Sequence, residues 1–182
     1  MAKILKFEND AKNKILAGVE KLEKAVSITL GPGGKNVMID EYGSIHVTRD
    51  GVTVARSINL KDKFENLGSN AIKEVAEKSN SRCGDGTTTS TVLAASIYRN
   101  GLRYVSLGSN ATSVKNGINK AAVRVVESLK AMSKPISTKE EIKRVATVSA
   151  NHDSSIGETI ADVMDKMLSR RSWLALRSLK KQ

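Results

Sequence analysis

Apolar residues recur at helical spacing along most of the chain, and this pattern predicts a mainly α-helical protein. The first helix is expected from about residue 9 to residue 30, with Asn9 or Asp10 as its N-cap. Further helices are expected over 64–80, 87–107 and 112–132, and two more follow Pro135. The apolar positions that define the first four helices are Ile15, Leu16, Val19, Leu22, Val26 and Ile28, then Phe64, Leu67, Ile72 and Val75, then Val92, Leu93 and Ile97, and finally Ile118, Ala122, Val125, Val126 and Leu129. Those of 64–80 are expected to face inward.

A short region between the first two helices has the two-residue period of β-strands. Residues 36–40 and 45–48 alternate apolar and polar side chains around the turn-rich segment 41–44, which predicts a β-hairpin. A third short strand is expected at 52–55. The fold class is therefore mainly α with a small β-hairpin or sheet.

Glycine, proline and capping residues mark the ends of the predicted elements. The segment Gly31-Pro32-Gly33-Gly34 must end the first helix, and it leaves backbone N–H groups free to face a ligand. Lys134-Pro135 breaks the helical pattern and is the expected domain boundary. Thr138 and Glu141 have the spacing of a capping box, so a helix is expected to begin there. A last helix is expected after His152.

Composition narrows the class of protein. The 182 residues contain no apolar run near the roughly 18 residues that cross a bilayer, so a membrane protein is not expected. Cys83 is the single cysteine, which excludes a disulfide framework, and with two histidines it excludes a Cys/His zinc cluster. The start of the chain lacks the pattern of a signal or transit peptide, so a cytoplasmic protein is expected.

The net charge of +11 is unevenly distributed along the chain. Residues 167–182 contain five basic residues and no acidic one. Without that tail, 25 basic and 19 acidic residues remain, a net charge of +6 carried by segments of mixed sign. The mixed body argues against a nucleic-acid-binding surface, and the basic tail leaves nucleic-acid binding as a minor alternative.

One glycine-rich loop contains the chemistry of a phosphate site. In Gly84-Asp85-Gly86-Thr87-Thr88-Thr89, glycines flank a carboxylate and three hydroxyl residues begin a helix. The N-terminus of a helix offers unpaired N–H groups to phosphates, and Asp85 could hold Mg²⁺. The loop is neither a Walker A sequence nor the dinucleotide-binding GxGxxG. The same residues are also typical of an N-capped helix that binds nothing.

Four segments together resemble the group I chaperonins, the GroEL type. They are TLGPGGKNV at 29–37, TRDGVTVA at 48–55, DKFENLG at 62–68 and CGDGTTTSTVLA at 83–94. The resemblance runs from Phe7 to about Lys166 and covers the family's amino-terminal portion. It implies a GroEL-like equatorial ATP-binding domain, in its amino-terminal part, over 1–133. It further implies the start of the intermediate domain over 134–166, followed by a non-family basic tail over 167–182.

The resemblance also implies a nucleotide site. By family correspondence, ATP is contacted by Thr29, Leu30, Gly31, Pro32, Arg49, Asp85, Gly86, Thr87, Thr88 and Thr89. Asp85 corresponds to the Mg²⁺ ligand, and Asp50 to the acid that assists hydrolysis. K⁺ is expected near Thr29, Arg49 and Thr88. Arg49 stands where many members have lysine, Gly33 replaces a usual lysine and Cys83 a usual alanine.

The family's function is ATP-driven folding of non-native client proteins. It implies other chaperonin subunits in a double heptameric ring and a GroES-type co-chaperonin as partners, with no membrane and no nucleic acid. We expect the tail to be an out-of-frame read that ends at an early stop. The alternative is therefore a truncated, inactive fragment, whose helices would expose apolar stripes where their partners are missing.

Overall fold

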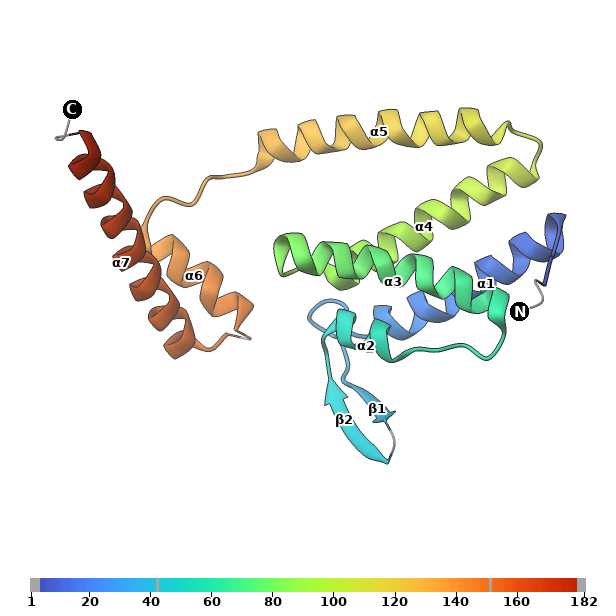
Figure 1. Cartoon of the computed structure of the whole chain (residues 1–182), viewed down its shortest axis with the longest axis horizontal. Helices are drawn as coiled ribbons and strands as arrows, with labels where there is room; N and C mark the ends of the chain where they lie inside the picture. Colours follow the sequence, from blue (N-terminus) through green and yellow to red (C-terminus); the bar gives the residue numbers. More distant parts are fainter. Residues whose placement is uncertain (1–3, 42, 151, 180–182) are drawn as a thin grey trace. The chain divides into compact units, whose positions relative to one another are not determined.

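The computed structural model describes residues 4–41, 43–150 and 152–179, with side chains as far as Met167. The elements, in chain order, are α1 (Glu8–Ser27), β1 (Val37–Glu41), β2 (Ser44–Thr48), α2 (Gly51–Ser57), α3 (Lys63–Cys83), α4 (Thr87–Ser106), α5 (Ala111–Met132), α6 (Lys139–Ser149) and α7 (Ser154–Leu179) (Figure 1). The predicted mainly α fold with a small hairpin is confirmed. The chain forms two compact units, Met1–Lys120 and Ala121–Gln182.

The core of the first unit lies between α1, α3 and α4, with α2 closing one end. Its buried side chains are Val19, Leu22 and Val26 of α1, Val52, Val54 and Ala55 of α2, Ile72 and Ala76 of α3, and Ala95 of α4. The side chains that α3 and α4 bury in this core are mostly small. The three long helices therefore lie close together, and the loop after α1 lies near the loop that joins α3 to α4.

The β-hairpin lies beside this core. β1 and β2 pair antiparallel in a register that places Met38 opposite Val47, and Gly43 at φ 84° supplies the left-handed residue of the turn. The predicted third strand at 52–55 is wrong, because these residues form α2. The Asp50 carboxylate accepts hydrogen bonds from two of the first N–H groups of α2, and this cap prevails over the alternating pattern of the sequence.

Several helix boundaries differ from the predicted ones. The N-cap of α1 is Phe7 rather than Asn9 or Asp10, and the helix ends before Ile28, which is exposed. α3 begins at an Asp62 cap and continues to Cys83, where Gly84 adopts the left-handed conformation that ends it. The expectation that Leu67 faces inward is wrong.

The second unit consists of the end of α5 together with α6 and α7, of which α6 and α7 pack against each other. The predicted capping box is confirmed, since Thr138 Oγ1 accepts from the Glu141 N–H while the Glu141 carboxylate accepts from the Thr138 N–H. The expected helix after His152 is α7. The predicted domain boundary at 133–134 follows α5, whereas the two compact units divide within it, and the domain assignment stays a prediction.

Two further observations concern exposed segments. α5, all of whose residues are described, buries none of them, and the predicted apolar positions Val125, Val126 and Leu129 are exposed. The predicted basic tail continues α7 as far as Leu179, and its side chains beyond Met167 lie outside the described residues. Among the described residues, no helix is both long and apolar enough to cross a membrane.

A cluster of ion pairs joins α1 to the beginning of α3. Lys14 Nζ lies 2.8 Å from Asp62 Oδ2 and 3.4 Å from Glu65 Oε1, and Lys21 donates to the other Glu65 oxygen. The pKa of Asp62 is lowered from 3.8 to about 2. The hydrogen bond from Lys14 is the largest cause, and the hydrogen bond from the Glu65 backbone N–H is the next. The same carboxylate therefore caps α3 and holds α1 against it.

We expect the Asp62→Asn variant to be less stable than the wild type in a pH-dependent way. Asparagine keeps the N-cap acceptor but loses the ion pair with Lys14. Because the folded-state pKa lies below the unfolded one, the contribution of the ion pair is complete above about pH 4 and is lost as the pH falls toward 2. Melting temperatures measured from pH 2 to pH 6 test this. A difference between the two chains that stays constant over that range contradicts it.

Candidate functional site

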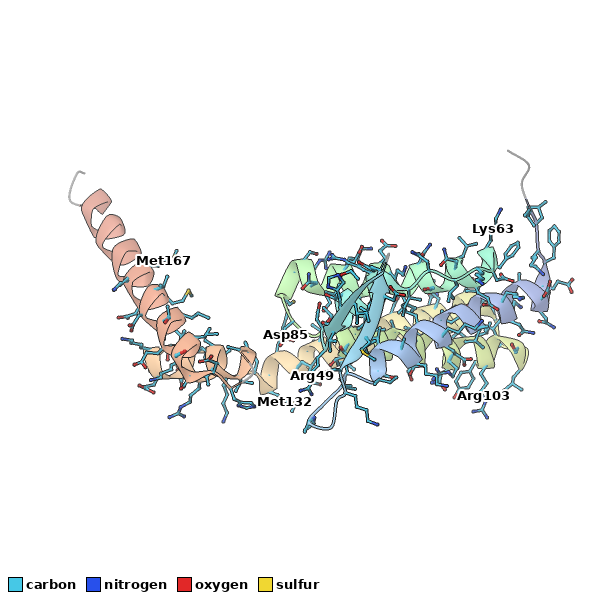
Figure 2. The ribbon with its side chains drawn as sticks, turned by 90° about the horizontal axis from the view of Figure 1, so that it is seen from below. Arg49, Lys63, Asp85, Arg103, Met132 and Met167 are labelled. Atoms are coloured by element: carbon cyan, nitrogen blue, oxygen red, sulfur yellow. The ribbon has the colours of Figure 1, made fainter. Side chains whose placement is uncertain are left out.

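A pocket of about 260 Å³ lies where three loops of the first unit meet. The loops follow α1, join β2 to α2, and join α3 to α4, and Figure 2 labels Arg49 and Asp85 on the second and third of them. The lining residues are Thr29, Leu30, Gly31, Arg49, Asp50, Gly51, Asp85, Gly86, Thr87, Thr88 and Thr89. The structure thus brings together every predicted site residue except Pro32, and it adds Gly51.

The loop after α1 presents Thr29 to the pocket. Thr29 is buried, and its Oγ1 donates a 2.8 Å hydrogen bond to the Val26 carbonyl. The same hydroxyl lies 3.3 Å from Thr88 Oγ1, which connects this loop to the start of α4. Gly31 has φ 74°, a conformation that glycine adopts without strain, and Pro32 is exposed outside the pocket lining. Two of the three loops are therefore joined by threonine hydroxyls.

Asp50 has a structural role besides any chemical one. Its Oδ1 accepts from the Val52 N–H at 3.3 Å, and its Oδ2 accepts from the Thr53 N–H at 3.0 Å and from the Thr53 hydroxyl at 2.5 Å. A carboxylate has about four acceptor sites, so Asp50 retains capacity for one further hydrogen bond, from a water in the pocket. Arg49 is exposed beside it and pairs with none of the described carboxylates at salt-bridge distance.

The loop between α3 and α4 is built by two left-handed glycines. Gly84 ends α3 at φ 69°, and Gly86 precedes α4 at φ 76°. No side chain caps α4, so the N–H groups at its start have no capping partner from the loop. Asp85 lies between the two glycines, and its Oδ1 accepts from the Gly86 N–H at 2.6 Å. These N–H groups, the helix dipole and the hydroxyls of Thr87, Thr88 and Thr89 make the pocket suited to an anion.

Gly51 also lines the pocket, although the sequence does not indicate it as a site residue. A Cβ atom at this position would lie 2.2 Å from Thr88 Oγ1 and 3.2 Å from Thr87 Oγ1. With the Thr88 hydroxyl in its present place, the start of α2 can therefore approach the start of α4 only because residue 51 has no side chain. In the sequence, Asp50-Gly51 has the pattern of an ordinary turn, and nothing in it indicates that residue 88 lies opposite.

The oxygen donors of the pocket fit a hard cation shared with phosphates. The described residues contain no group of three or more His, Cys, Asp and Glu side chains that could hold a metal ion by themselves. Mg²⁺ is usually held by one or two carboxylates together with water and phosphate oxygens, and Asp85 and Asp50 both line the pocket. Such an ion would therefore be held here together with a phosphate ligand.

Comparison with known proteins gives a consistent family. The model of the TCP-1/cpn60 chaperonin family matches residues 22–180. Two crystal forms of the chaperonin gp146 from the bacteriophage EL 2 (Pseudomonas aeruginosa), both in the presence of ATP-BeFx, are similar to this chain. Both are 30% identical to it, with TM-scores of 0.71 and 0.72. A group III chaperonin in the open state is 22% identical, with a TM-score of 0.76, and shares the fold.

The similarity covers most of this chain and a smaller part of its relatives. It includes 85% and 86% of this chain for the two phage structures and 88% for the group III chaperonin. The chain spans 28% of the length of the phage chaperonin and 32% of that of the group III chaperonin. The family match continues to residue 180, so it includes most of the basic tail, whose assignment as a non-family segment stays a prediction.

Proposed function

The chain belongs to the TCP-1/cpn60 chaperonin family, and on that premise we propose that it provides the amino-terminal part of the nucleotide site of an ATP-dependent chaperonin subunit. The observation that carries the proposal is the pocket in which the start of α4 meets the loop after α1 and the Arg49-Asp50 turn. These loops supply N–H groups, hydroxyls, one cationic side chain and two carboxylates, which together match the chemistry of a magnesium–nucleotide complex.

Each group of residues would have a separate task in that site. The first N–H groups of α4 and the hydroxyls of Thr87, Thr88 and Thr89 bind the phosphates, and Arg49 adds positive charge beside them. Asp85 holds Mg²⁺, which neutralises phosphate charge when it is bound. Asp50 accepts a hydrogen bond from the water that attacks the terminal phosphate and thereby orients it. Thr29 and Thr88, whose hydroxyls lie close together, contribute oxygen ligands for K⁺.

The finer assignment is a group I chaperonin subunit. It is supported by the four motifs at 29–37, 48–55, 62–68 and 83–94, which occur in the order of that group. We propose that such a subunit assembles with other subunits into a ring-shaped cage, works with a GroES-type co-chaperonin and binds non-native proteins. An apolar pocket of about 570 Å³ lies between α4 and the start of α5. Exposed apolar surface of this kind is typical of interaction sites, and it supports assembly with further chaperonin segments.

Thermal unfolding of the 182-residue chain with and without MgATP tests the proposal. Ligand at a hundred times its Kd stabilises the folded state by about 2.7 kcal/mol. For a chain of this size that corresponds to a rise in Tm of about 5–10 °C. We expect this rise with MgATP and a smaller one with ATP in EDTA.

Two variants make the test specific. Asp85→Asn removes the one of the two pocket carboxylates that we assign to Mg²⁺, and it should abolish the difference between MgATP and ATP in EDTA. Asp40→Asn is the matched control, because Asp40 lies in the hairpin outside the pocket and its Oδ1 accepts only a local hydrogen bond from Gly43 among the described residues. Unfolding that MgATP leaves unchanged in the wild type contradicts a competent nucleotide site and favours the truncated, inactive fragment.

A further inference from the structure

We propose that Ser79 is a positioning residue, which holds the Asp85–Gly86 peptide in the orientation that presents the Asp85 carboxylate to the pocket. The inference rests on the proposed function and assigns to that site a residue outside its lining. Ser79 lies in α3, more than one helical turn before the end of that helix, and is half-buried. Its Oγ donates a 3.1 Å hydrogen bond to the carbonyl oxygen of Asp85.

This hydrogen bond is unusual for a helical serine. Serine hydroxyls within helices ordinarily donate to a carbonyl of the preceding turn. Ser81 of the same helix does so, with its Oγ 3.2 Å from the Lys78 carbonyl, and Ser90 of α4 does so toward Thr87. Ser79 instead reaches forward, out of its own helix and into the loop that follows. Its hydroxyl therefore fixes the loop rather than the helix.

Without the hydrogen bond from Ser79, the Asp85–Gly86 peptide group would rotate easily. Asp85 is flanked by Gly84 and Gly86, which are both in the left-handed region, and glycine has a wide choice of backbone angles. A Cβ at Gly86 would have Ser79 Oγ as its nearest neighbour, at 3.7 Å, which shows that the serine side chain lies directly beside the loop. Ser79 thus selects one orientation of the Asp85–Gly86 peptide.

Because the peptide bond is planar, the orientation of the Asp85 carbonyl also determines the position of the Asp85 carboxylate. In a trans peptide the carbonyl and the N–H point in opposite directions. With the Asp85 carbonyl held by Ser79, the Gly86 N–H points away from Ser79, and Asp85 Oδ1 accepts from it at 2.6 Å. Two hydrogen bonds in series therefore connect the α3 hydroxyl to the carboxylate that we assign to Mg²⁺. Loss of the hydrogen bond from Ser79 would therefore also release the hydrogen bond between the Gly86 N–H and the Asp85 carboxylate.

The test measures binding of two probes, MgATP and ATP in EDTA, to the full chain by calorimetry. Ser79→Ala is expected to weaken MgATP binding about fivefold, the effect of one net hydrogen bond, and to change binding of metal-free ATP less than twofold. Ser81→Ala is the matched control, since it removes a serine hydroxyl of the same helix that does not contact the loop, and it should leave both affinities unchanged. Ser79→Thr keeps a hydroxyl and should restore MgATP binding.

Hydrogen exchange of the Gly86 amide provides a readout that does not depend on nucleotide. We expect faster exchange at Gly86 in Ser79→Ala than in the wild type and in Ser81→Ala. Equal weakening of both probes, or unchanged MgATP binding in Ser79→Ala, overturns the role of Ser79 alone. Absence of MgATP binding by the wild type overturns the proposed function, and the positioning role with it.

Discussion

Replacing Gly18 by alanine is expected to destabilise the first unit more than any other single change proposed for it. Gly18 lies on α1 where that helix crosses α3, and a Cβ there would lie 1.8 Å from the Glu65 carbonyl oxygen. The contact is reciprocal, because a Cβ at Gly68 of α3 would lie 2.1 Å from the Ile15 carbonyl oxygen. Both obstacles are backbone atoms, which cannot move aside by rotation of a side chain. The two helices must therefore separate to admit a methyl group.

The size of the effect follows from two opposing contributions. Alanine in a helix interior is favoured over glycine by about 1 kcal/mol. Overpacking a closed contact destabilises by typically 1–3 kcal/mol and occasionally more, and separation of α1 from α3 also loosens the core around Leu22 and Ile72. Because the obstacle is a backbone atom, we expect the overpacking to reach the upper end of that range, which leaves a net loss of about 2 kcal/mol, a large part of the stability of a small domain. Urea unfolding measures it.

Gly117→Ala is the matched control for this prediction. Gly117 also lies within a helix, but a Cβ there would have no neighbour within 4 Å. The same substitution should therefore leave stability unchanged or raise it slightly through helix propensity. Equal unfolding midpoints for Gly18→Ala and Gly117→Ala would contradict a closed contact between α1 and α3.

The close packing also explains which parts of the fold were predictable from the sequence. The long helices were predictable because their apolar period is sustained over many residues. The inward faces of these helices were less predictable, because the periodic pattern is defined by large apolar side chains, whereas many of the buried ones are small. Leu93 is exposed on α4, whereas Thr91 and Ala95 are buried. Helices that approach as closely as α1 and α3 leave room only for small residues between them. The spacing of apolar residues in the sequence does not indicate how close two helices are.

The short helix α2 shows a second limit. Residues 52–55 alternate in a way that is typical of a strand, but seven residues are too few for a period to separate strand from helix. The decision is made by one side chain, Asp50, which satisfies two N–H groups at the start of the helix. Capping of this kind is visible in a sequence only when the following residues are already assigned to a helix.

The candidate site was predictable to the extent that its residues lie in motifs. Family resemblance located ten residues that the structure brings to one pocket, from three loops distant in the sequence. Gly51 and Ser79 were missed for a common physical reason. Each acts through an atom of another segment, Gly51 by leaving space for Thr88 and Ser79 by donating to the Asp85 carbonyl. Such contacts depend on three-dimensional placement, which spacing does not reveal.

Gly51→Ala is expected to weaken MgATP binding by at least tenfold. A Cβ at residue 51 would lie 2.2 Å from Thr88 Oγ1, so the Thr88 hydroxyl must leave its place 3.3 Å from Thr29 or α2 must move away from α4. Either response displaces groups that line the pocket, and Asp50 lies directly beside the substituted position. Loss of one well-placed hydrogen bond to a charged ligand corresponds to about 1.5–3 kcal/mol, which is a factor of ten or more. Calorimetric titration of the full chain with MgATP measures the change.

The cause of that loss can be separated from general destabilisation. Gly33→Ala alters a glycine of the neighbouring loop whose Cβ would meet nothing within 4 Å, and it should bind MgATP as the wild type does. Thr88→Ala removes the atom that the new methyl group would strike. If the two substitutions act through this one contact, the double variant Gly51→Ala/Thr88→Ala binds about as well as Thr88→Ala alone, because the effects are coupled and not additive. Losses that multiply in the double variant would instead show that Gly51 acts on the pocket through movement of α2, independently of the Thr88 hydroxyl.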